Sequence, residues 1–118
     1  MEQILIVVAG LLGAAGIALA AAGAHGHPQS GLDAAGYLLV IHAVALLGGA
    51  DALHQGLLAR TVGAGALLAL AIGAALFGSD VAMRAFVGHR LFPMAAPAGG
   101  LAMIAGWLAI AIAAVTGR

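Results

Sequence analysis

The chain has 118 residues, of which 64% are hydrophobic and only 7% are charged, and its formal net charge is zero. Typical soluble domains are about 45–50% apolar and about 25% charged, so this chain has too few charges to cover a surface in water. The composition therefore excludes a soluble domain and indicates a lipid environment, and the zero net charge argues against nucleic-acid binding. Because cysteine is absent, disulfides and thiolate-bound zinc or iron–sulfur centres are excluded.

Two apolar segments in the first half are long enough to span a bilayer, which takes about 20 mostly apolar residues. The first covers about residues 4–24 and carries no charge. The residues Met1-Glu2-Gln3 before it lack the positive charge of a secretory signal, so we predict a transmembrane helix. The second covers about residues 34–58, with Asp33 as its expected N-cap.

Two further spans are predicted in the second half, over about residues 61–77 and 97–115. Thr61 is the expected cap of the third helix, and Pro97 is a favourable first-turn residue for the fourth. The whole chain is thus predicted to be one all-α domain, an antiparallel bundle of four transmembrane helices. The arginines are nearly balanced between the two sides, so the orientation of the termini stays open.

The connections between the helices differ in length. Only about residues 55–60 separate the second and third helices, which predicts antiparallel neighbours. Residues 78–96 separate the third and fourth, and a short interfacial helix capped by Ser79 or Asp80 is one interpretation of this segment. An irregular loop is the other.

Small residues recur at the spacing that lets membrane helices approach closely. The predicted packing residues on the first helix are Gly10, Ala14, Ala18 and Ala22. Those on the fourth helix are Ala98, Ala102 and Gly106. Ala69 and Gly73 form a shorter stripe on the third helix. One interpretation uses these stripes inside the bundle, and the other directs some of them towards other chains.

Ionisable residues inside membrane spans are costly and often functional. His42 is the clearest case here, and because Gly49 shares its helix face we expect it to point at a packed interface. Asp51 lies on the opposite side of the same helix, where we expect it to pair with His54 or Arg60. His25, His42 and Asp51 form the candidate polar site.

The histidines raise the alternative of a metal or proton site. His25, His27, His42 and the loop carrying His89 are predicted to lie towards one membrane side, and imidazole binds zinc or copper and carries protons. The competing interpretation is that His25 and His27 end the first helix, with His25 contacting the start of the second. We favour this structural interpretation and predict no metal and no cofactor.

The hydroxyl groups of the chain give no sign of catalysis. No serine or threonine stands in a recognisable nucleophile context, and no glycine-rich loop suits a phosphate. We therefore expect no catalytic residues. Trp107 lies deep in the fourth helix, where a packing role is expected.

Several sequence blocks, in order, resemble one known family. They are Gly23-Ala24-His25-Gly26, His42-Ala43-Val44-Ala45-Leu46-Leu47, Leu76-Phe77-Gly78-Ser79, and Pro97-Ala98-Gly99-Gly100 followed by Gly106-Trp107. Together they are similar to the domain-of-unknown-function family 423, the transmembrane protein 256-like proteins, over most of the chain. The resemblance implies a small four-helix membrane protein, in bacteria of the inner membrane, without an assigned activity.

The chain also departs from that family pattern. Leu38 and Leu39 stand where the family usually has Tyr and Gln, with Tyr37 one residue earlier. Asp80 replaces an apolar position, and the block before it is one residue short. These departures weaken the case for a shared polar site around His42.

Three functions follow as expectations. The first is a non-catalytic structural or accessory component of the lipid bilayer that forms a homo-oligomer or joins a larger complex. The second is a small proton or solute transporter in which His42 and Asp51 line the route. The third and weakest is a metal or redox site built on His25, His27 and His42.

Overall fold

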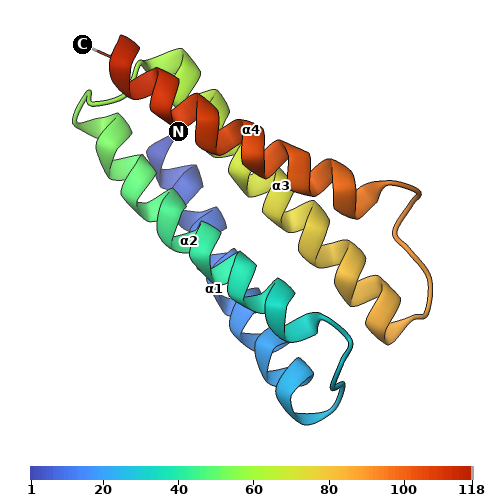
Figure 1. The fold of residues 1–118 in the computed structure, drawn as a ribbon. Coiled ribbons are helices and arrows are strands. Elements are labelled where there is room, and N and C mark those ends of the chain that lie inside the picture. The colour runs from blue at the N-terminus through green and yellow to red at the C-terminus, as the bar shows by residue number, and fades with distance from the viewer. Residues whose placement is uncertain (118) are drawn as a thin grey trace.

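The computed structural model describes residues 1–117, and it folds them into four helices without strands (Figure 1). The helices are α1 (Glu2–His25), α2 (Leu32–His54), α3 (Arg60–Phe86) and α4 (Ala95–Thr116). Each is long and apolar enough to cross a membrane. The predicted all-helical bundle with four transmembrane-length helices is therefore confirmed.

The third helix is longer than predicted. It continues without a break to Phe86, so residues 79–86 form its last two turns and no separate interfacial helix exists between α3 and α4. Ser79 and Asp80 were expected to cap such a helix, but both lie inside α3. The reason is that the Asp80 carboxylate finds partners outside its own backbone, as described below, so it does not terminate the helix.

The helix starts also differ in detail from the sequence expectation. Gly31, with a φ of 82°, is the N-cap of α2, and Asp33 lies within its first turn. The Ser30 hydroxyl accepts the Leu32 N–H at 3.3 Å. Thr61 lies inside α3, which begins one residue earlier. Pro97 does fall in the first turn of α4, as predicted.

Helices α1 and α2 form one antiparallel hairpin whose backbones touch. A Cβ placed on Gly36 would lie 2.5 Å from both the Ala20 nitrogen and the Gly16 oxygen. A Cβ on Gly23 would lie 2.5 Å from the Asp33 nitrogen. Because these contacts are with backbone atoms, only glycine fits there, and the hairpin is held by the close packing that small residues permit.

Helices α3 and α4 form a second hairpin with the same kind of crossing. A Cβ on Gly73 would lie 2.7 Å from the Gly99 oxygen, and one on Gly99 would lie 2.7 Å from the Gly73 oxygen. About two turns along, a Cβ on Gly106 would lie 3.0 Å from the Ala66 oxygen. Each hairpin therefore has its own glycine–glycine contact, so the two halves of the chain are built alike.

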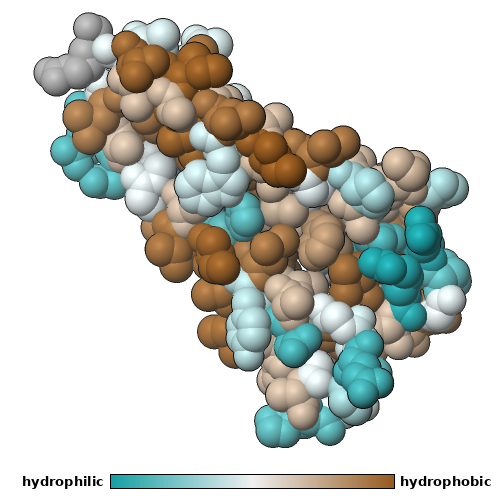
Figure 2. Space-filling model, viewed as in Figure 1, coloured by the Kyte–Doolittle hydropathy of each residue, from teal (hydrophilic) through white to brown (hydrophobic). Residues whose placement is uncertain are grey.

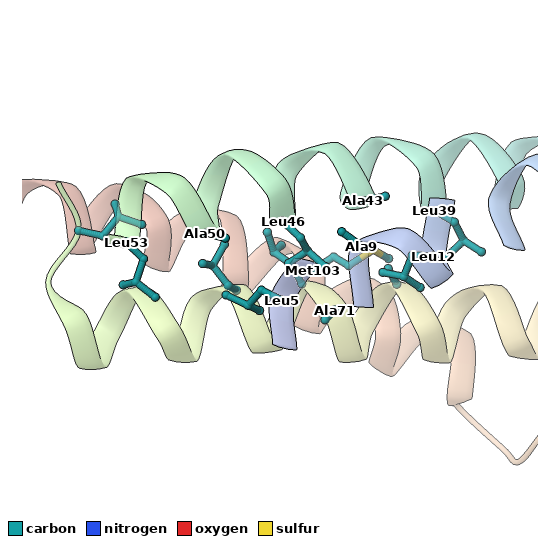
Figure 3. Close-up of a cluster of buried hydrophobic side chains, with 14 of the residues drawn as sticks. Leu5, Ala9, Leu12, Leu39, Ala43, Leu46, Ala50, Leu53, Ala71 and Met103 are labelled. Carbon is teal, nitrogen blue, oxygen red and sulfur yellow. The ribbon is translucent and has the colours of Figure 1, made fainter. Parts of the chain in front are cut away.

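The two hairpins meet along α2 and α3, where leucines fill spaces left by glycines. Leu67 packs on Gly49, and Leu39 packs on Gly78. We call this contact the seam. The main buried cluster runs along it and takes in residues of all four helices, among them Leu5, Leu46, Leu70 and Met103 (Figure 3).

The polar residues gather at the two ends of the molecule. The terminal end holds Met1, Gly117 and the turn of residues 55–59, which is fastened to α4 by a 2.8 Å hydrogen bond from Ala59 N–H to the Ala113 carbonyl. The loop end holds residues 26–31 and 87–94. Figure 2 shows hydrophobic residues over the middle and much of the terminal end of the visible face, and hydrophilic residues mainly at the loop end.

Candidate functional site

His42 is the ionisable residue that lies deepest in a span. It sits at the middle of α2 and is only 4% exposed. The expectation that it points at a packed interface is confirmed, since Gly49 on the same face contacts Leu67 of α3. Leu38, Ala43 and Leu46 of the same helix are half-buried or buried around it.

Both ring nitrogens of His42 have partners. The Nδ1 atom lies 2.8 Å from the Leu38 carbonyl oxygen, and the Trp107 indole Nε1 lies 3.2 Å from Nε2. Since the indole is only a donor and the carbonyl only an acceptor, Nε2 must accept and Nδ1–H must donate. The partners therefore assign a neutral imidazole protonated on Nδ1. The two rings also meet edge-on, with centroids 5.8 Å apart.

This pair joins helices that have no close backbone contact. Among residues 1–117, α4 packs its backbone against α3 alone, yet Trp107 of α4 reaches His42 of α2. The packing role expected for Trp107 is only partly met, because its side chain is 44% exposed, while its indole N–H satisfies a buried nitrogen of His42. In this arrangement neither nitrogen of His42 is free to bind a metal ion.

Asp51 is not brought to His42. It lies on the exposed side of α2, where its carboxylate accepts a 2.6 Å hydrogen bond from Gln55 Nε2. The expected pairing of Asp51 with His54 or Arg60 is wrong, because both residues pair with Glu2 instead. The Glu2 carboxylate lies 2.8 Å from Arg60 Nη2 and 3.7 Å from His54 Nδ1. Glu2, the first residue of α1, can reach Arg60 because the starts of α1 and α3 lie together at the terminal end.

The histidines at the loop end remain dispersed. His25 ends α1 as predicted and is exposed, but no hydrogen bond joins its side chain to the start of α2 among the described residues. His27 packs edge-on against Phe86, with ring centroids 4.9 Å apart. Over residues 1–117, no three His, Asp or Glu side chains converge as a metal-binding group.

The predicted packing stripes lie mostly outside the bundle. Of the α1 residues, Gly10, Ala14 and Ala18 are exposed and Ala22 is half-buried. The residues that α1 buries are instead Leu5, Ala9, Leu12, Gly16 and Gly23. On α4, Gly106 is buried as expected inside the bundle, Ala102 is half-buried and Ala98 is exposed. Gly73 of the shorter stripe is buried in the α3–α4 contact.

Sequence reasoning missed the role of Asp80, which is 1% exposed and is the one buried carboxylate among the described residues. Its Oδ1 accepts the Leu91 N–H at 2.8 Å, and its Oδ2 lies 3.3 Å from Arg84 Nε. The available signal was the four-residue spacing of Asp80 and Arg84, which is an ion-pair spacing on a helix. This spacing has meaning only within a helix, and the predicted third helix ends at residue 77, whereas α3 continues to Phe86.

Two apolar grooves open on the surface of the bundle. One of about 550 Å³ lies between α1 and α2 and is lined by Ile17, Ala20, Ala21, Ala24, Tyr37, Val40 and Ile41. The other, of about 340 Å³, lies between the hairpins, where Ala15 and Ala18 of α1 face Ala75 and Ser79 of α3. Neither groove contains His42 or Asp51, so neither forms a polar route through them.

Comparison with protein-family models, with curated proteins and with solved structures gives no match for this chain. The resemblance to family 423 therefore stays a prediction that rests on the sequence blocks quoted above.

Proposed function

We propose that the chain is a non-catalytic membrane component that associates laterally, with copies of itself or within a larger membrane complex. The observation that carries the proposal is an outward glycine on every helix. Cβ atoms placed on Gly10, Gly48, Gly65 and Gly100 would have no atom within 4 Å. None of these glycines lies in a turn, and Gly10, Gly48 and Gly65 are exposed while Gly100 is half-buried. Small residues on an outer face are what neighbouring membrane helices pack against.

The outer helices leave much apolar surface uncovered. In the most apolar window of α1, and likewise of α4, only 22% of the residues are buried within the chain. The exposed stripe of Gly10, Ala14 and Ala18 lies on this uncovered part of α1. The bacterial inner membrane as the location belongs to the same proposal, since only the resemblance to family 423 suggests it.

Native mass spectrometry after mild detergent extraction tests the proposal. We expect the protein to be released as an oligomer or with a stoichiometric partner chain. Gly10→Leu, Gly48→Leu, Gly65→Leu and Gly100→Leu are compared one at a time, and at least one is expected to release the monomer because leucine blocks close approach. Ile17→Leu is the matched control, since Ile17 is exposed on α1 and already bulky. A stable wild-type monomer without a partner would contradict the proposal.

Transport is a second candidate, and it rests on the burial of His42 in the middle of α2. Ionisable residues at such a depth often mark a solute or proton path. The expected result is a lower permeability of reconstituted vesicles to protons and metal ions when His42→Ala is introduced. Asp51→Ala is compared beside it. Equal fluxes in the wild type and both variants would remove this candidate.

A further inference from the structure

The end of α3 lies beyond the depth that a bilayer core accommodates. With 27 residues, α3 is about 40 Å long at about 1.5 Å per residue, whereas the hydrocarbon core is about 30 Å thick. If Arg60 marks one boundary, about 20 residues bring the chain to Asp80 at the other boundary. The segment from Asp80 to Phe86 then lies among the lipid headgroups.

At this depth, one buried carboxylate contacts both segments that carry the arginines, the last turns of α3 with Arg84 and the loop that follows with Arg90. Asp80 contacts Arg84 through Nε and accepts the N–H of Leu91, the residue directly after Arg90. Contact through Nε leaves the two terminal amino groups of Arg84 for another anion, and its side chain is 44% exposed. Arg90 is exposed and has no ion-pair partner among residues 1–117. These two residues are half of the four cations in the chain.

Exposed hydrophobic side chains accompany the polar residues of the loop end. Phe86 and Val87 stand between the two arginines in the sequence, and Leu91, Phe92 and Met94 follow Arg90. A soluble anion gains nothing from such neighbours. A lipid presents a phosphate to the arginines and acyl chains to the hydrophobic side chains, so it matches both parts of the surface.

We propose that Arg84 and Arg90, arranged by Asp80 at the end of α3, form a binding site for the phosphate of an anionic phospholipid headgroup. Arginine suits this role because its planar guanidinium donates two parallel hydrogen bonds to phosphate oxygens. The hydrophobic side chains of residues 86–94 lie beside the acyl chains of the same lipid. The site is separate from His42 and does not depend on the proposed lateral association.

The test uses the full chain in nanodiscs that contain equal amounts of phosphatidylglycerol and phosphatidylcholine, followed by native mass spectrometry of retained lipid. We expect the wild type to retain phosphatidylglycerol preferentially. Arg84→Gln and Arg90→Gln should each weaken this retention about fivefold, which is about 1 kcal/mol for each cation near an anionic surface, and the double variant about 25-fold. Arg84→Lys/Arg90→Lys, which keeps both charges but not the planar guanidinium, should restore only part of it.

Arg60→Gln is the matched control, because Arg60 lies at the terminal end and is paired with Glu2. It should retain phosphatidylglycerol as the wild type does. Added sodium chloride should release the lipid from the wild type, a readout that does not depend on the folding of any variant. Equal retention of the two lipids, or unchanged retention in Arg84→Gln/Arg90→Gln, would overturn the proposal. Displacement by inorganic phosphate would assign the site to a soluble anion and overturn it too.

Discussion

A single polar contact, from the Trp107 indole to His42, joins the two hairpins in the middle of the bundle. Its geometry requires a neutral imidazole whose second nitrogen is occupied by the Leu38 carbonyl. A buried polar group costs free energy unless it is satisfied, so Trp107 explains how α2 tolerates a histidine at this depth. The sequence located His42 in one span and Trp107 in the middle of another, but it contained no signal for their contact, which depends on how the two hairpins dock.

Trp107→Phe is expected to destabilise the protein, because it leaves His42 Nε2 buried without a donor. Hydrogen bonds between membrane helices contribute about 0.6 kcal/mol on average and up to about 1.7 kcal/mol. Unfolding in mixed micelles, followed by circular dichroism, measures this loss. In the double variant His42→Leu/Trp107→Phe, the loss should be smaller than the sum of the two single losses. Additive losses would contradict an energetic coupling between the two residues.

Asp80→Ala is expected to release the loop of residues 87–94, because the Leu91 N–H loses its acceptor. Hydrogen bonds to charged groups contribute about 1.5–3 kcal/mol, so amide hydrogen exchange of the loop should rise at least about tenfold. Asp80→Asn is the matched control, since its amide oxygen still accepts the Leu91 N–H. Wild-type exchange rates in Asp80→Ala would show that Asp80 does not hold the loop.

At the scale of the helices, the sequence predicted the existence and approximate position of all four elements, because length and hydropathy decide this in lipid. It did not predict which faces pack. Nearly every face of these helices is apolar, so no polar stripe separates the inside from the lipid side, and Gly10 looked as suitable as Gly16. The end of α3 was missed because Gly78-Ser79-Asp80 resembles a helix stop, while the partners of Asp80 come from a loop later in the chain.

Gly36→Ala and Gly10→Ala should have opposite effects on stability. At Gly36 the new Cβ meets backbone atoms of Ala20 and Gly16 at 2.5 Å, so the helices must separate, and overpacking of this kind costs about 1–3 kcal/mol. At Gly10 the Cβ meets nothing within 4 Å, and alanine favours the helix by up to about 1 kcal/mol. Unfolding in mixed micelles measures both changes. Equal tolerance at the two positions would contradict the glycine crossing of α1 and α2.

At the scale of the whole molecule, the chain is two hairpins placed side by side, with overall dimensions of 47 × 25 × 18 Å. Each hairpin has a direct backbone crossing at glycines, whereas the seam between them relies on leucines, the His42–Trp107 pair and contacts at the two ends. The helices α1 and α2 are therefore packed more closely against each other than their hairpin is packed against α3–α4. The sequence predicted the short turn between α2 and α3 but not this difference between the contacts.

Separating the chain between Gly56 and Leu57 should leave two fragments that each form a hairpin and associate through the seam. Gly56 lies in the exposed turn with a φ of 77°, and the cut removes no helix. Co-expression in a membrane, extraction and affinity purification of one tagged fragment should recover the other. Trp107→Phe in the second fragment should lower the recovery, and Gly100→Ala, which lies on the outer side of α4, is the control. Independent purification of the two fragments would contradict the seam.

The backbone crossings also determine how the protein moves. Two helices whose carbonyl oxygens and amide nitrogens touch have no room to slide or rotate past each other, so each hairpin behaves as a rigid body. The residues 55–59 are the only covalent link between these bodies. Any large rearrangement in the bilayer is therefore expected to be a rocking of one pair of helices against the other, with this short turn as the hinge.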